Sequence, residues 1–397
     1  MTGTNKRSLS RRGIIKGGAA LTAAAAVPTG WAIAQAKPIK VGLMLPYSGT
    51  FAKLGENITI AIELHIAEKG GKLGGRELTI VKLDDESKPE LGPQNADRLV
   101  KRDQVDVLIG TVHSGVQMGI HKVVMESGTL TIVPNAGNDV VTRAQCVKNV
   151  FRTSFSNWQS AYGMGLALGK KGIKRAAWIT WDYAAGADMG TGFKEGLEKG
   201  GGQVAQELKL PFPQTNFQPL LAQIPGLNVE AVGAFFAGGG AVQFVKEYAA
   251  AGIKVPLCGP GFLTEGTLEA QGAAAEGIET ALHYGDGLDN AKNNAFRKAF
   301  RDKAGRDADV YAVQGYDAAQ LLAVGLEVVK GKIEDQAELY KALRAAKIDS
   351  PRGPISMSPS QNVVHNVYLR KATGGQNKVI GVAAENLADP GTGCKLA

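Results

Sequence analysis

A serine stands where a strand is expected to end and a helix to begin, and this position suits the binding of a carboxylate. Ser114 follows an apolar run at 105–109 and precedes a segment of helical period at 116–126. The first turn of a helix presents unpaired N–H groups and a partial positive charge, so it can hold a carboxylate without an arginine. The structural alternative is that Ser114 only caps its helix, because serine is a favoured N-cap residue.

His113, next to Ser114, extends this candidate site. Its imidazole could donate a hydrogen bond to a ligand oxygen or respond to the protonation of the ligand. The alternative is a packed or solvated histidine at the end of a strand. The other histidines show no metal-ligand spacing, and they are His65, His121, His283 and His365. We therefore expect neither a metal nor a cofactor.

No pattern in the chain predicts catalysis. The sequence contains no Gly-x-Ser-x-Gly nucleophile elbow, no His-Glu-x-x-His helix and no phosphate loop ending in Gly-Lys-Ser/Thr. Gly190, Gly192 and Gly196 loosely match a dinucleotide loop, but they lie well past the expected strand and lack the spacing of the third glycine. The chain is therefore expected to bind a ligand and not to be an enzyme.

Short apolar runs, often rich in Val and Ile, alternate with longer segments of helical period. This alternation is typical of a parallel α/β sheet. Strands are expected at 39–45, 78–83, 105–109, 130–133, 176–181, 204–210, 231–236 and 255–258. Helices are expected at 56–69, 94–102, 116–126, 159–171, 189–199 and 242–251.

The strands fall into two series, which predicts an α/β fold with two doubly wound lobes. The first four strands form one group, 150–156 makes an extended connection, and a second series restarts at Ala176. Two such lobes would form a cleft where the carboxyl ends of their strands face each other. The loops after strands, including the loop at Ser114, are therefore expected to carry the function.

The first 36 residues have the composition of a signal peptide. They contain no Asp or Glu and carry five basic residues, followed by an apolar run at 17–27. That run is about half of the ~20 residues that a membrane-spanning helix needs. Cleavage is expected after Ala36, and the mature protein is expected in the periplasm. The segment 10–16 resembles the twin-arginine export pattern, with the Sec route as the alternative.

The basic balance of the chain lies largely in this leader. The whole chain has 45 Lys and Arg against 37 Asp and Glu. Removing the five basic residues of the leader leaves 40 against 37, a net charge of only +3. The mature part contains no Lys/Arg run of the kind that binds a phosphate backbone. We therefore expect no nucleic-acid partner. We also expect the protein to be a monomer.

Three cysteines allow one disulfide bond in an oxidising compartment. None of them forms a Cys-x-x-Cys pair, which excludes a cysteine metal cluster. Cys258 ends the apolar run at 255–258 and is interpreted as a buried strand thiol. The favoured pair is therefore Cys146 with Cys394. Three free thiols are the alternative.

Five segments together resemble the branched-chain amino-acid binding protein family, the type I periplasmic receptors of ABC transporters. They are 39–49 (IKVGLMLPYSG), 109–115 (IGTVHSG), 134–136 (PNA), 215–220 (TNFQPL) and 311–319 (YAVQGYDAA). Each segment is a weak signal, but their order and spacing are specific. The resemblance covers nearly the whole mature chain.

The resemblance implies a fold, a partner and site residues. In this family the chain crosses between lobes three times, which assigns 37–155 and 282–352 to lobe one and 156–281 and 353–397 to lobe two. The partner would be the membrane permease of an ABC transporter. Ser114 matches the family position whose hydroxyl binds the ligand carboxylate. The loop Asn135, Ala136 and Gly137 would offer further polar groups to the same end of the ligand, with a plain turn as the alternative.

One departure from the family excludes an amine on the ligand. Amino-acid receptors have an acidic residue after Gly-Pro in lobe two, whereas Gly261 and Phe262 follow Gly-Pro here. Burying an ammonium group without a counter-charge costs on the order of several kcal/mol of binding free energy. Glu265 is near in sequence, but it could replace the acid only if the loop were rebuilt. We therefore predict a carboxylate ligand without an amine.

Further departures favour an aromatic ligand. Small residues replace two family tyrosines, at Ala185 and in the loop 237–240 that contains Gly239. Aromatic residues occur at other cleft-facing loops, and they are Tyr47, Phe51, Trp158, Trp181, Tyr183 and Phe262. Such rings suit a flat apolar ligand, although each could instead belong to the core, as is expected for Trp178. The segments 181–186 and 350–353 also resemble the branch of the family that takes up benzoate-type or aryl-keto acids.

The sequence thus predicts the extracytoplasmic solute-binding component of an ABC importer. It would close by a hinge around a small carboxylate, an aromatic acid of the benzoate or aryl-keto type. One alternative is a branched-chain amino-acid binding protein of the same family. Others are a redox enzyme exported by the twin-arginine route, and a ligand-binding module that serves a separate membrane sensor.

Overall fold

The computed structural model describes Gly3 and residues 37–396. The predicted signal peptide, apart from Gly3, lies outside the described residues, and so do the twin-arginine pattern and the expected cleavage site. Within the described part of the chain, no helix is both long enough and apolar enough to cross a membrane.

The first sheet has six strands in the order β2-β3-β1-β4-β5-β6. Its strands are β1 (Ile39–Leu45), β2 (Lys72–Leu73), β3 (Arg76–Asp84), β4 (Val107–Gly110), β5 (Leu130–Val133) and β6 (Val150–Arg152). All neighbours are parallel except β2 and β3. The central strands β1, β4 and β5 are almost wholly buried, as expected for parallel strands with helices on both faces.

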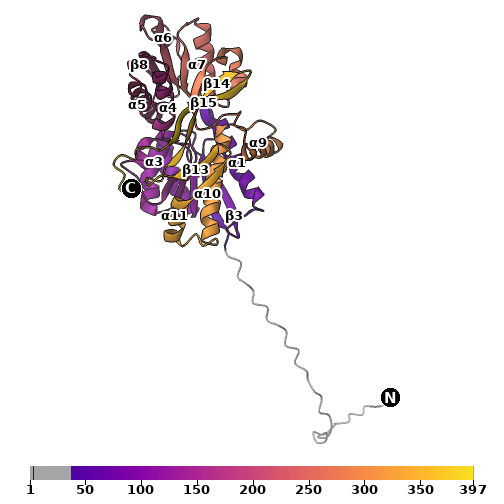
Figure 1. The fold of residues 1–397 in the computed structure, drawn as a ribbon. Helices are drawn as coiled ribbons and strands as arrows, with labels where there is room; N and C mark the ends of the chain where they lie inside the picture. The colour runs from indigo at the N-terminus through magenta and orange to yellow at the C-terminus, as the bar shows by residue number, and fades with distance from the viewer. Residues whose placement is uncertain (1–2, 4–36, 397) are drawn as a thin grey trace. The chain divides into compact units, whose positions relative to one another are not determined.

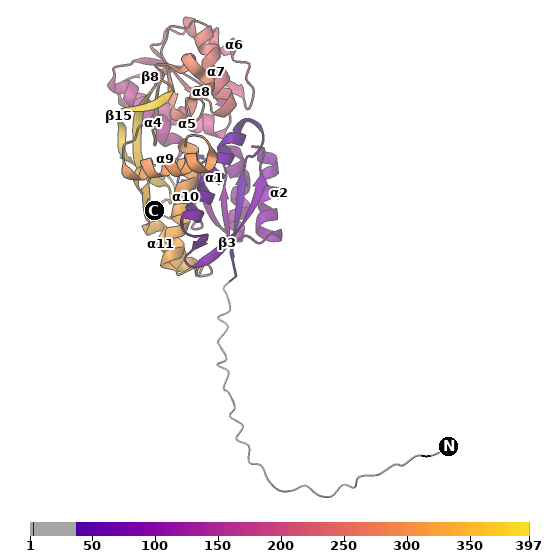
Figure 2. The ribbon, with the colours of Figure 1, turned by 90° about the vertical axis from the view of Figure 1, so that its right-hand side faces the viewer.

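Figures 1 and 2 show the helices that surround this sheet in the lower half of the folded part. They are α1 (Ala52–Glu68), α2 (Gly92–Asp97), α3 (Ser114–Ser127), α10 (Val310–Val328) and α11 (Gln336–Ala345). α1 packs along α10, and α9 (Ala291–Ala304) also contacts α1. The sequence between β11 and β12 therefore returns to the first sheet.

The second sheet has nine strands and continues in the order β12-β13-β14-β11-β10-β9-β7-β8, with β15 paired to β14. Its strands are β7 (Arg175–Asp182), β8 (Gln203–Pro211), β9 (Ala231–Phe235), β10 (Leu257–Pro260), β11 (Glu279–Leu282), β12 (Lys347–Ser350), β13 (Gly353–Met357), β14 (Val363–Thr373) and β15 (Gln376–Leu387). The run β8-β7-β9-β10-β11 is parallel, and β12 to β15 add antiparallel pairs.

Five α-helices complete this half. The helices are α4 (Asn157–Lys170), α5 (Ala184–Lys199), α6 (Gln218–Leu221), α7 (Gly238–Ala250) and α8 (Leu268–Gln271). Short helical turns also occur in both halves, and they are Gly49–Phe51, Pro89–Leu91, Arg98–Arg102 and Asp139–Thr142 among the elements of the first sheet, and Ile224–Gly226, Gly261–Leu263 and Gly272–Ala275 among those of the second. α4 packs against α5 and also contacts β11, β14 and β15, so it covers the junction of the parallel and antiparallel parts.

The α/β fold with two parallel-sheet lobes is confirmed. Each of the eight predicted strands overlaps an observed parallel strand, and each predicted helix overlaps an observed one. The expected extended connection at 150–156 begins with β6, which joins the edge of the first sheet. The residue boundaries of the two lobes stay a prediction.

The cysteines and Trp178 behave as their sequence context indicated. Cys146 and Cys394 form a disulfide bond with a Cα–Cα distance of 5.4 Å, so the alternative of three free thiols is wrong. Cys258 is a buried free thiol in β10, and burial raises its pKa to about 12. Trp178 is fully buried in β7 and stacks on Phe193, which confirms its place in the core.

Buried arginines fasten the segments where the chain passes between the sheets. The Arg352 guanidinium donates to the Asp317 carboxylate at 2.9 Å and to the carbonyl oxygens of Thr153 and Ser154. Arg152 donates to Asn362 Oδ1 at 2.7 Å, which ties β6 to the start of β14. Both guanidiniums are fully desolvated, so these bonds fix the crossing segments in one arrangement.

Candidate ligand-binding site

A cavity lies where loops after strands of both sheets meet. We call it the ligand cavity, and it encloses about 320 Å3, its mouth included. Its walls are formed by Phe51, Leu54, Val112, Ser114, Asn135, Gly137, Phe155, Asn157, Tyr183, Ala185, Met189, Phe235, Ala237, Phe262 and Tyr311. None of these lining residues carries a formal charge. The cavity therefore suits a ligand with a large apolar part and few polar groups.

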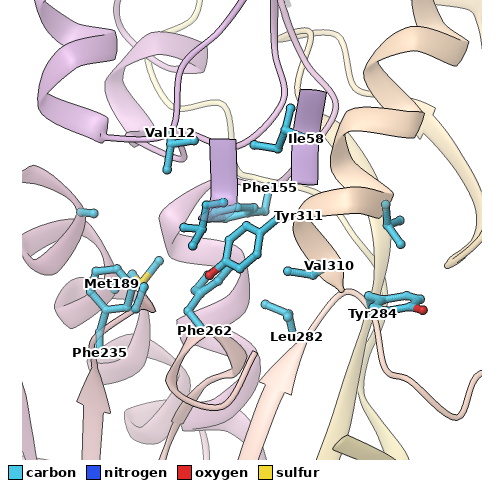
Figure 3. Close-up of a cluster of buried hydrophobic side chains, with 14 of the residues drawn as sticks. Ile58, Val112, Phe155, Met189, Phe235, Phe262, Leu282, Tyr284, Val310 and Tyr311 are labelled. Atoms are coloured by element: carbon cyan, nitrogen blue, oxygen red, sulfur yellow. The ribbon is translucent and has the colours of Figure 1, made fainter. Parts of the chain in front are cut away.

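Aromatic rings form one side of the ligand cavity. The Phe262 ring lies 4.8 Å from Phe155, 6.1 Å from Phe235 and 6.3 Å from Tyr311, measured between ring centroids. Figure 3 shows the Tyr311 ring between Phe155 and Phe262, with Met189 and Phe235 beyond its hydroxyl end. Spacings of this kind are typical of offset and edge-to-face aromatic packing. A planar ring would find partner faces and edges here.

Ser114 begins α3 and belongs to the polar part of the cavity wall, together with Asn135, Gly137 and Asn157. His113 is the N-cap of this helix, because its Nδ1 atom accepts hydrogen bonds from the N–H groups of Gly115 and Val116 at 3.1 and 3.3 Å. The interpretation of Ser114 as a mere cap is therefore wrong. Ser114 Oγ accepts a hydrogen bond from Asn157 Nδ2 at 3.3 Å, which leaves its own proton for a ligand oxygen.

His113 lies behind the cavity wall and does not line it. Its ring is sandwiched by Tyr183 at 4.8 Å and Phe212 at 4.7 Å. Burial lowers its pKa to about 4, so the ring is neutral, and Nδ1 is already an acceptor. The remaining nitrogen, Nε2, is buried without a partner. His113 is thus arranged to hold the first turn of α3 and not to carry a charge.

The loop after β5 presents two residues to the same end. Asn135 and Gly137 line the cavity, while the Ala136 N–H donates to the Thr111 carbonyl at 2.9 Å and Ala136 does not line it. The Asn135 amide donates to Gln314 Oε1 at 2.7 Å. Among the described hydrogen bonds, none uses the N–H of Gly137 or of Ser114. These two N–H groups and the Ser114 hydroxyl are therefore available to a ligand.

Asn157 connects this polar end to the second sheet. Its Nδ2 atom also donates to Asp188 Oδ2 on α5 at 3.1 Å, and the same oxygen accepts the Asp139 N–H at 3.0 Å. Burial, reinforced by the Asp188 charge, raises the pKa of Asp139 to about 7. Burial likewise raises the pKa of Asp188. A chain of two hydrogen bonds therefore joins Ser114 to a carboxyl group of elevated pKa.

Glu265 does not provide a counter-charge in the ligand cavity. Its Oε2 atom accepts a hydrogen bond from Arg370 Nη1 at 2.5 Å, and its Oε1 atom accepts one from the Val310 N–H at 2.7 Å. The residue is buried and is not part of the cavity wall. Both oxygens are thus engaged, which supports the prediction that no ammonium group binds here.

Tyr311 is a cavity residue that the sequence indicated only as part of a motif. Its side chain is 1% exposed, and its hydroxyl is buried without a hydrogen-bond partner in the protein. Burial raises its pKa well above the usual value, so the hydroxyl keeps its proton. An unpaired buried hydroxyl is costly, which makes it a point of attachment for a ligand group.

The predicted site residues divide into two groups. Six lie on the wall of the ligand cavity, and they are Phe51, Ser114, Asn135, Gly137, Tyr183 and Phe262. Gly239 lines a neighbouring cavity instead. The residues that the sequence did not single out as ligand-binding are Leu54, Val112, Phe155, Asn157, Ala185, Met189, Phe235, Ala237 and Tyr311.

Three predicted rings are turned away by their own hydrogen bonds. The Tyr47 hydroxyl is bonded to Thr59 Oγ1 at 2.8 Å. Trp158 Nε1 donates to Glu195 at 2.6 Å. Trp181 is fully buried, and its Nε1 donates to the Gln214 carbonyl at 2.8 Å. None of the three lines the ligand cavity, because each indole or phenol is fixed by a partner outside it.

Comparisons with known proteins point to one family. A family model described as periplasmic binding protein matches residues 38–377. A solute-binding protein of an ABC transporter from R. palustris, solved in complex with benzoate, is 50% identical, with a TM-score of 0.89 over 90% of this chain and 100% of that chain. A solute-binding protein from Rhodopseudomonas palustris BisB5, in complex with 3,4-dihydroxybenzoic acid, is 31% identical, with a TM-score of 0.84 over 89% and 99%. The Leu/Ile/Val-binding protein homolog 6 of Brucella melitensis is 31% identical over 89% of this chain and 92% of its own length.

Proposed function

Because this chain belongs to the periplasmic binding protein family, we propose that it is the solute-binding component of an ABC importer for an aromatic carboxylate. The ligand class would be benzoates and related aryl acids. The relatives from R. palustris and from Rhodopseudomonas palustris BisB5, which were solved with benzoate and with 3,4-dihydroxybenzoic acid, support this class.

One observation carries the proposal: the ligand cavity combines an aromatic wall with neutral hydrogen-bond donors. The donors are the Gly137 N–H together with the N–H and hydroxyl of Ser114, which begins α3, where the helix adds a partial positive charge for a carboxylate. The rings lie at the other side, around Phe262. A benzoate has the same division into a carboxylate and a ring.

Binding would proceed by closure of a hinge. The carboxylate would first dock on Ser114 and Gly137 of lobe one. Phe235 and Phe262 of lobe two would then cover the ring, and the bond from Asn157 to Asp188 would close the polar end. In this proposal the permease recognises the closed, loaded form. Small-angle scattering that shows no compaction when benzoate saturates the protein would exclude this mechanism.

The relative named as a Leu/Ile/Val-binding protein homolog favours a second candidate, a branched-chain amino acid. Isothermal titration of the mature protein with benzoate, 4-hydroxybenzoate, leucine and valine separates the two. Binding of the benzoates alone is the expected result, since Glu265 is engaged by Arg370. Binding of leucine or valine in preference to benzoate would overturn the aromatic assignment.

We also propose that the protein performs no chemistry on its ligand and works in the periplasm as a monomer without a cofactor. Recovery of chemically unchanged benzoate from the saturated protein checks the first point. Mass spectrometry of the protein released from the periplasm should give a mature chain that starts at Lys37. A chain that keeps residues 1–36 would refute the proposed cleavage after Ala36.

A further inference from the structure

A second cavity adjoins the ligand cavity. It encloses about 510 Å3, its mouth included, and we call it the distal chamber. Its walls are Thr50, Lys53, Leu54, Gly238, Gly239, Val242, Glu265, Gly266, Thr267, Ala270, Asp309 and Tyr311. Leu54 and Tyr311 line both cavities, so these two side chains form the partition between them.

The distal chamber exists because α7 begins with three glycines. A Cβ atom added at Gly239 would meet nothing within 4 Å, so this position opens onto free space. Gly238 has a φ of +56° and lies against the Thr50 carbonyl, where a Cβ atom would approach to 2.6 Å. The glycines thus permit close contact between the start of α7 and the turn Gly49–Phe51 on one side and leave the chamber unfilled on the other.

Several hydrogen-bond donors around the distal chamber have no partner. No side chain caps α7, so the N–H groups of its first turn stay available. The Thr267 side chain is 7% exposed and its hydroxyl has no partner, as is also true of the Tyr311 hydroxyl. Lys53 is exposed and forms no ion pair with any described residue, although its charge acts on nearby Asp309.

The two carboxylates of the chamber are already satisfied. Asp309 Oδ1 accepts the Ala312 N–H at 2.9 Å, and its Oδ2 accepts Asn57 Nδ2 at 2.7 Å. The oxygens of Glu265 are engaged by Arg370 and by the Val310 N–H. The groups left without partners are therefore donors and one ammonium. Such a set fits a hydrogen-bond acceptor with negative charge.

We propose that the distal chamber is a second subsite that takes a carboxylate at the far end of an aromatic ligand. The ligand class then extends from benzoates to aromatic dicarboxylates. One carboxylate lies at Ser114, the ring crosses beside Tyr311, and the second carboxylate lies near Lys53 and the start of α7. This inference rests on the proposed function and specifies its substrate class.

Isothermal titration with a set of para-substituted benzoates tests the subsite. The probes are benzoate, terephthalate, 4-(carboxymethyl)benzoate, 4-carboxycinnamate and the cationic 4-(aminomethyl)benzoate. At least one dicarboxylate should bind roughly 10-fold more tightly than benzoate, the gain that one charged hydrogen bond gives. Tighter binding of the aminomethyl compound than of every dicarboxylate would overturn the proposal.

Two variants locate the gain. Lys53→Met should remove most of the dicarboxylate advantage and leave benzoate binding unchanged, since Lys53 does not line the ligand cavity. Gly239→Leu should lower the ratio of dicarboxylate to benzoate affinity, because its side chain would occupy the chamber. Lys246→Met is the matched control, an exposed lysine on α7 that lines neither cavity.

The outcomes keep the two proposals apart. Absence of benzoate binding would refute the proposed function itself. Benzoate binding without any dicarboxylate advantage, or an advantage that Lys53→Met and Gly239→Leu leave intact, would refute only the second subsite. A third outcome is that no dicarboxylate binds more tightly than benzoate, while phosphate at millimolar concentration shifts the melting temperature of the wild type but not of Lys53→Met. The chamber would then be a site for a separate inorganic anion, and the proposal would be wrong.

Discussion

The polar end of the ligand cavity, around Ser114, and its aromatic end, around Phe262 and Tyr311, differ in how the chain holds their side chains. At the polar end, His113 Nδ1 accepts hydrogen bonds from the first turn of α3, and Asn157 donates one to Ser114 Oγ, so both fix that turn. At the aromatic end the rings pack on one another, and the Tyr311 hydroxyl is left without a partner.

This difference separates affinity from selectivity. The polar end offers a set of donors that suits any carboxylate, so it would contribute similarly to every ligand of the class. The aromatic end decides which ring and which substituent fit, because its contacts depend on shape and on one unpaired hydroxyl. Substitutions at the two ends should therefore change different quantities.

The largest effect is expected from the ion pair that supports the aromatic end. Arg370 donates to Glu265 and to the carbonyl of Gly261, next to Phe262, while Glu265 accepts the N–H of Val310, next to Tyr311. Arg370→Met would leave Glu265 buried without its partner and should lower the free energy of unfolding by about 3–5 kcal/mol at pH 8.

Urea denaturation measures this loss. Burial already raises the pKa of Glu265 to about 7, so the carboxyl of the variant should take up a proton at pH 5 and recover part of the stability. The control is Arg301→Met on α9, which removes an exposed ion pair with Asp307. It should lower the free energy of unfolding by about 1 kcal/mol or less. Equal losses in the two variants would show that the buried pair does not support the site.

The next effect isolates the polar end. Ser114→Ala removes a side-chain hydroxyl at that end of the cavity wall, and it should weaken benzoate binding by about 1–3 kcal/mol. The melting temperature of the free protein should stay nearly constant, because Asn157 keeps its bond to Asp188. Ser127→Ala, at the other end of α3, is the control. An unchanged affinity in Ser114→Ala would move the carboxylate to another position.

A smaller effect isolates the aromatic end. Tyr311→Phe removes a hydroxyl that has no partner in the protein, so the free protein should be as stable as the wild type or slightly more stable. Binding of 4-hydroxybenzoate or of a dicarboxylate should weaken by about 0.5–1.5 kcal/mol, while benzoate binding stays unchanged.

Tyr340→Phe is the matched control for this substitution. Its hydroxyl donates to the Gly128 carbonyl at 3.1 Å, far from the ligand cavity in the fold. Loss of that bond should lower stability by about 0.5–1.5 kcal/mol without any change in binding. If Tyr311→Phe behaves in the same way as this control, the Tyr311 hydroxyl has no role toward the ligand.

The sequence predicted the parallel parts of both sheets because each strand there is a short apolar run between helices. It did not predict the region after β10. The long strands β14 and β15 pair with register shifts near His365 and Leu369, and β14 buries the polar side chains of His365 and Arg370, so the alternation of apolar and polar residues in their sequence is weak. α10 is buried along nearly its whole length, which hides the periodicity that marks an amphipathic helix.

The sequence predicted those site residues whose place at the end of a strand determines which cavity they reach. Ser114 and Gly137 follow strands, and the ends of parallel strands meet at one edge of a sheet, so both reach the cavity. Trp158 and Tyr47 also follow strands, but hydrogen bonds to Glu195 and Thr59 turn their rings away. These hydrogen bonds depend on partners that are distant in sequence or on the rotamer of the side chain, and the sequence pattern does not show either.

Tyr311, Asn157 and Met189 were missed for a related reason. They belong to three helices that meet only in the folded chain, namely α10, α4 and α5. Tyr311 occurs in a motif that identified the family, yet nothing local distinguishes it from Tyr316, which packs against Phe296. The unpaired hydroxyl is the distinguishing feature, and only the structure shows it.

The acidic groups behind the polar end should make binding depend on pH. The N–H of Asp139 donates a hydrogen bond to the carboxylate of Asp188. The other charged groups around this pair are Arg143, Arg152 and Asp389. The pKa values of Asp139 and Asp188 are raised, mainly by burial. Their protonated forms are therefore favoured in the folded state, and the stability that they contribute is lost as the pH rises through the folded pKa, which for Asp139 is about 7.

A bound carboxylate at Ser114 would add a negative charge two hydrogen bonds from Asp188, through Asn157. It should further raise the pKa values of Asp188 and of Asp139, which is about 7 before binding, so the complex takes up protons and affinity falls as the pH rises from 6 to 8. We expect a change of about 0.5–1 kcal/mol in benzoate binding, measured by titration calorimetry in buffers of different ionisation enthalpy. Asp188→Asn should weaken this dependence, because it removes a titrating group and the charge that helps to raise the pKa of Asp139, and Asp182→Asn, a change at an exposed residue at the end of β7, should leave it intact. Affinity that rises with pH in the wild type would show that the ligand carboxylate does not lie at this end of the cavity.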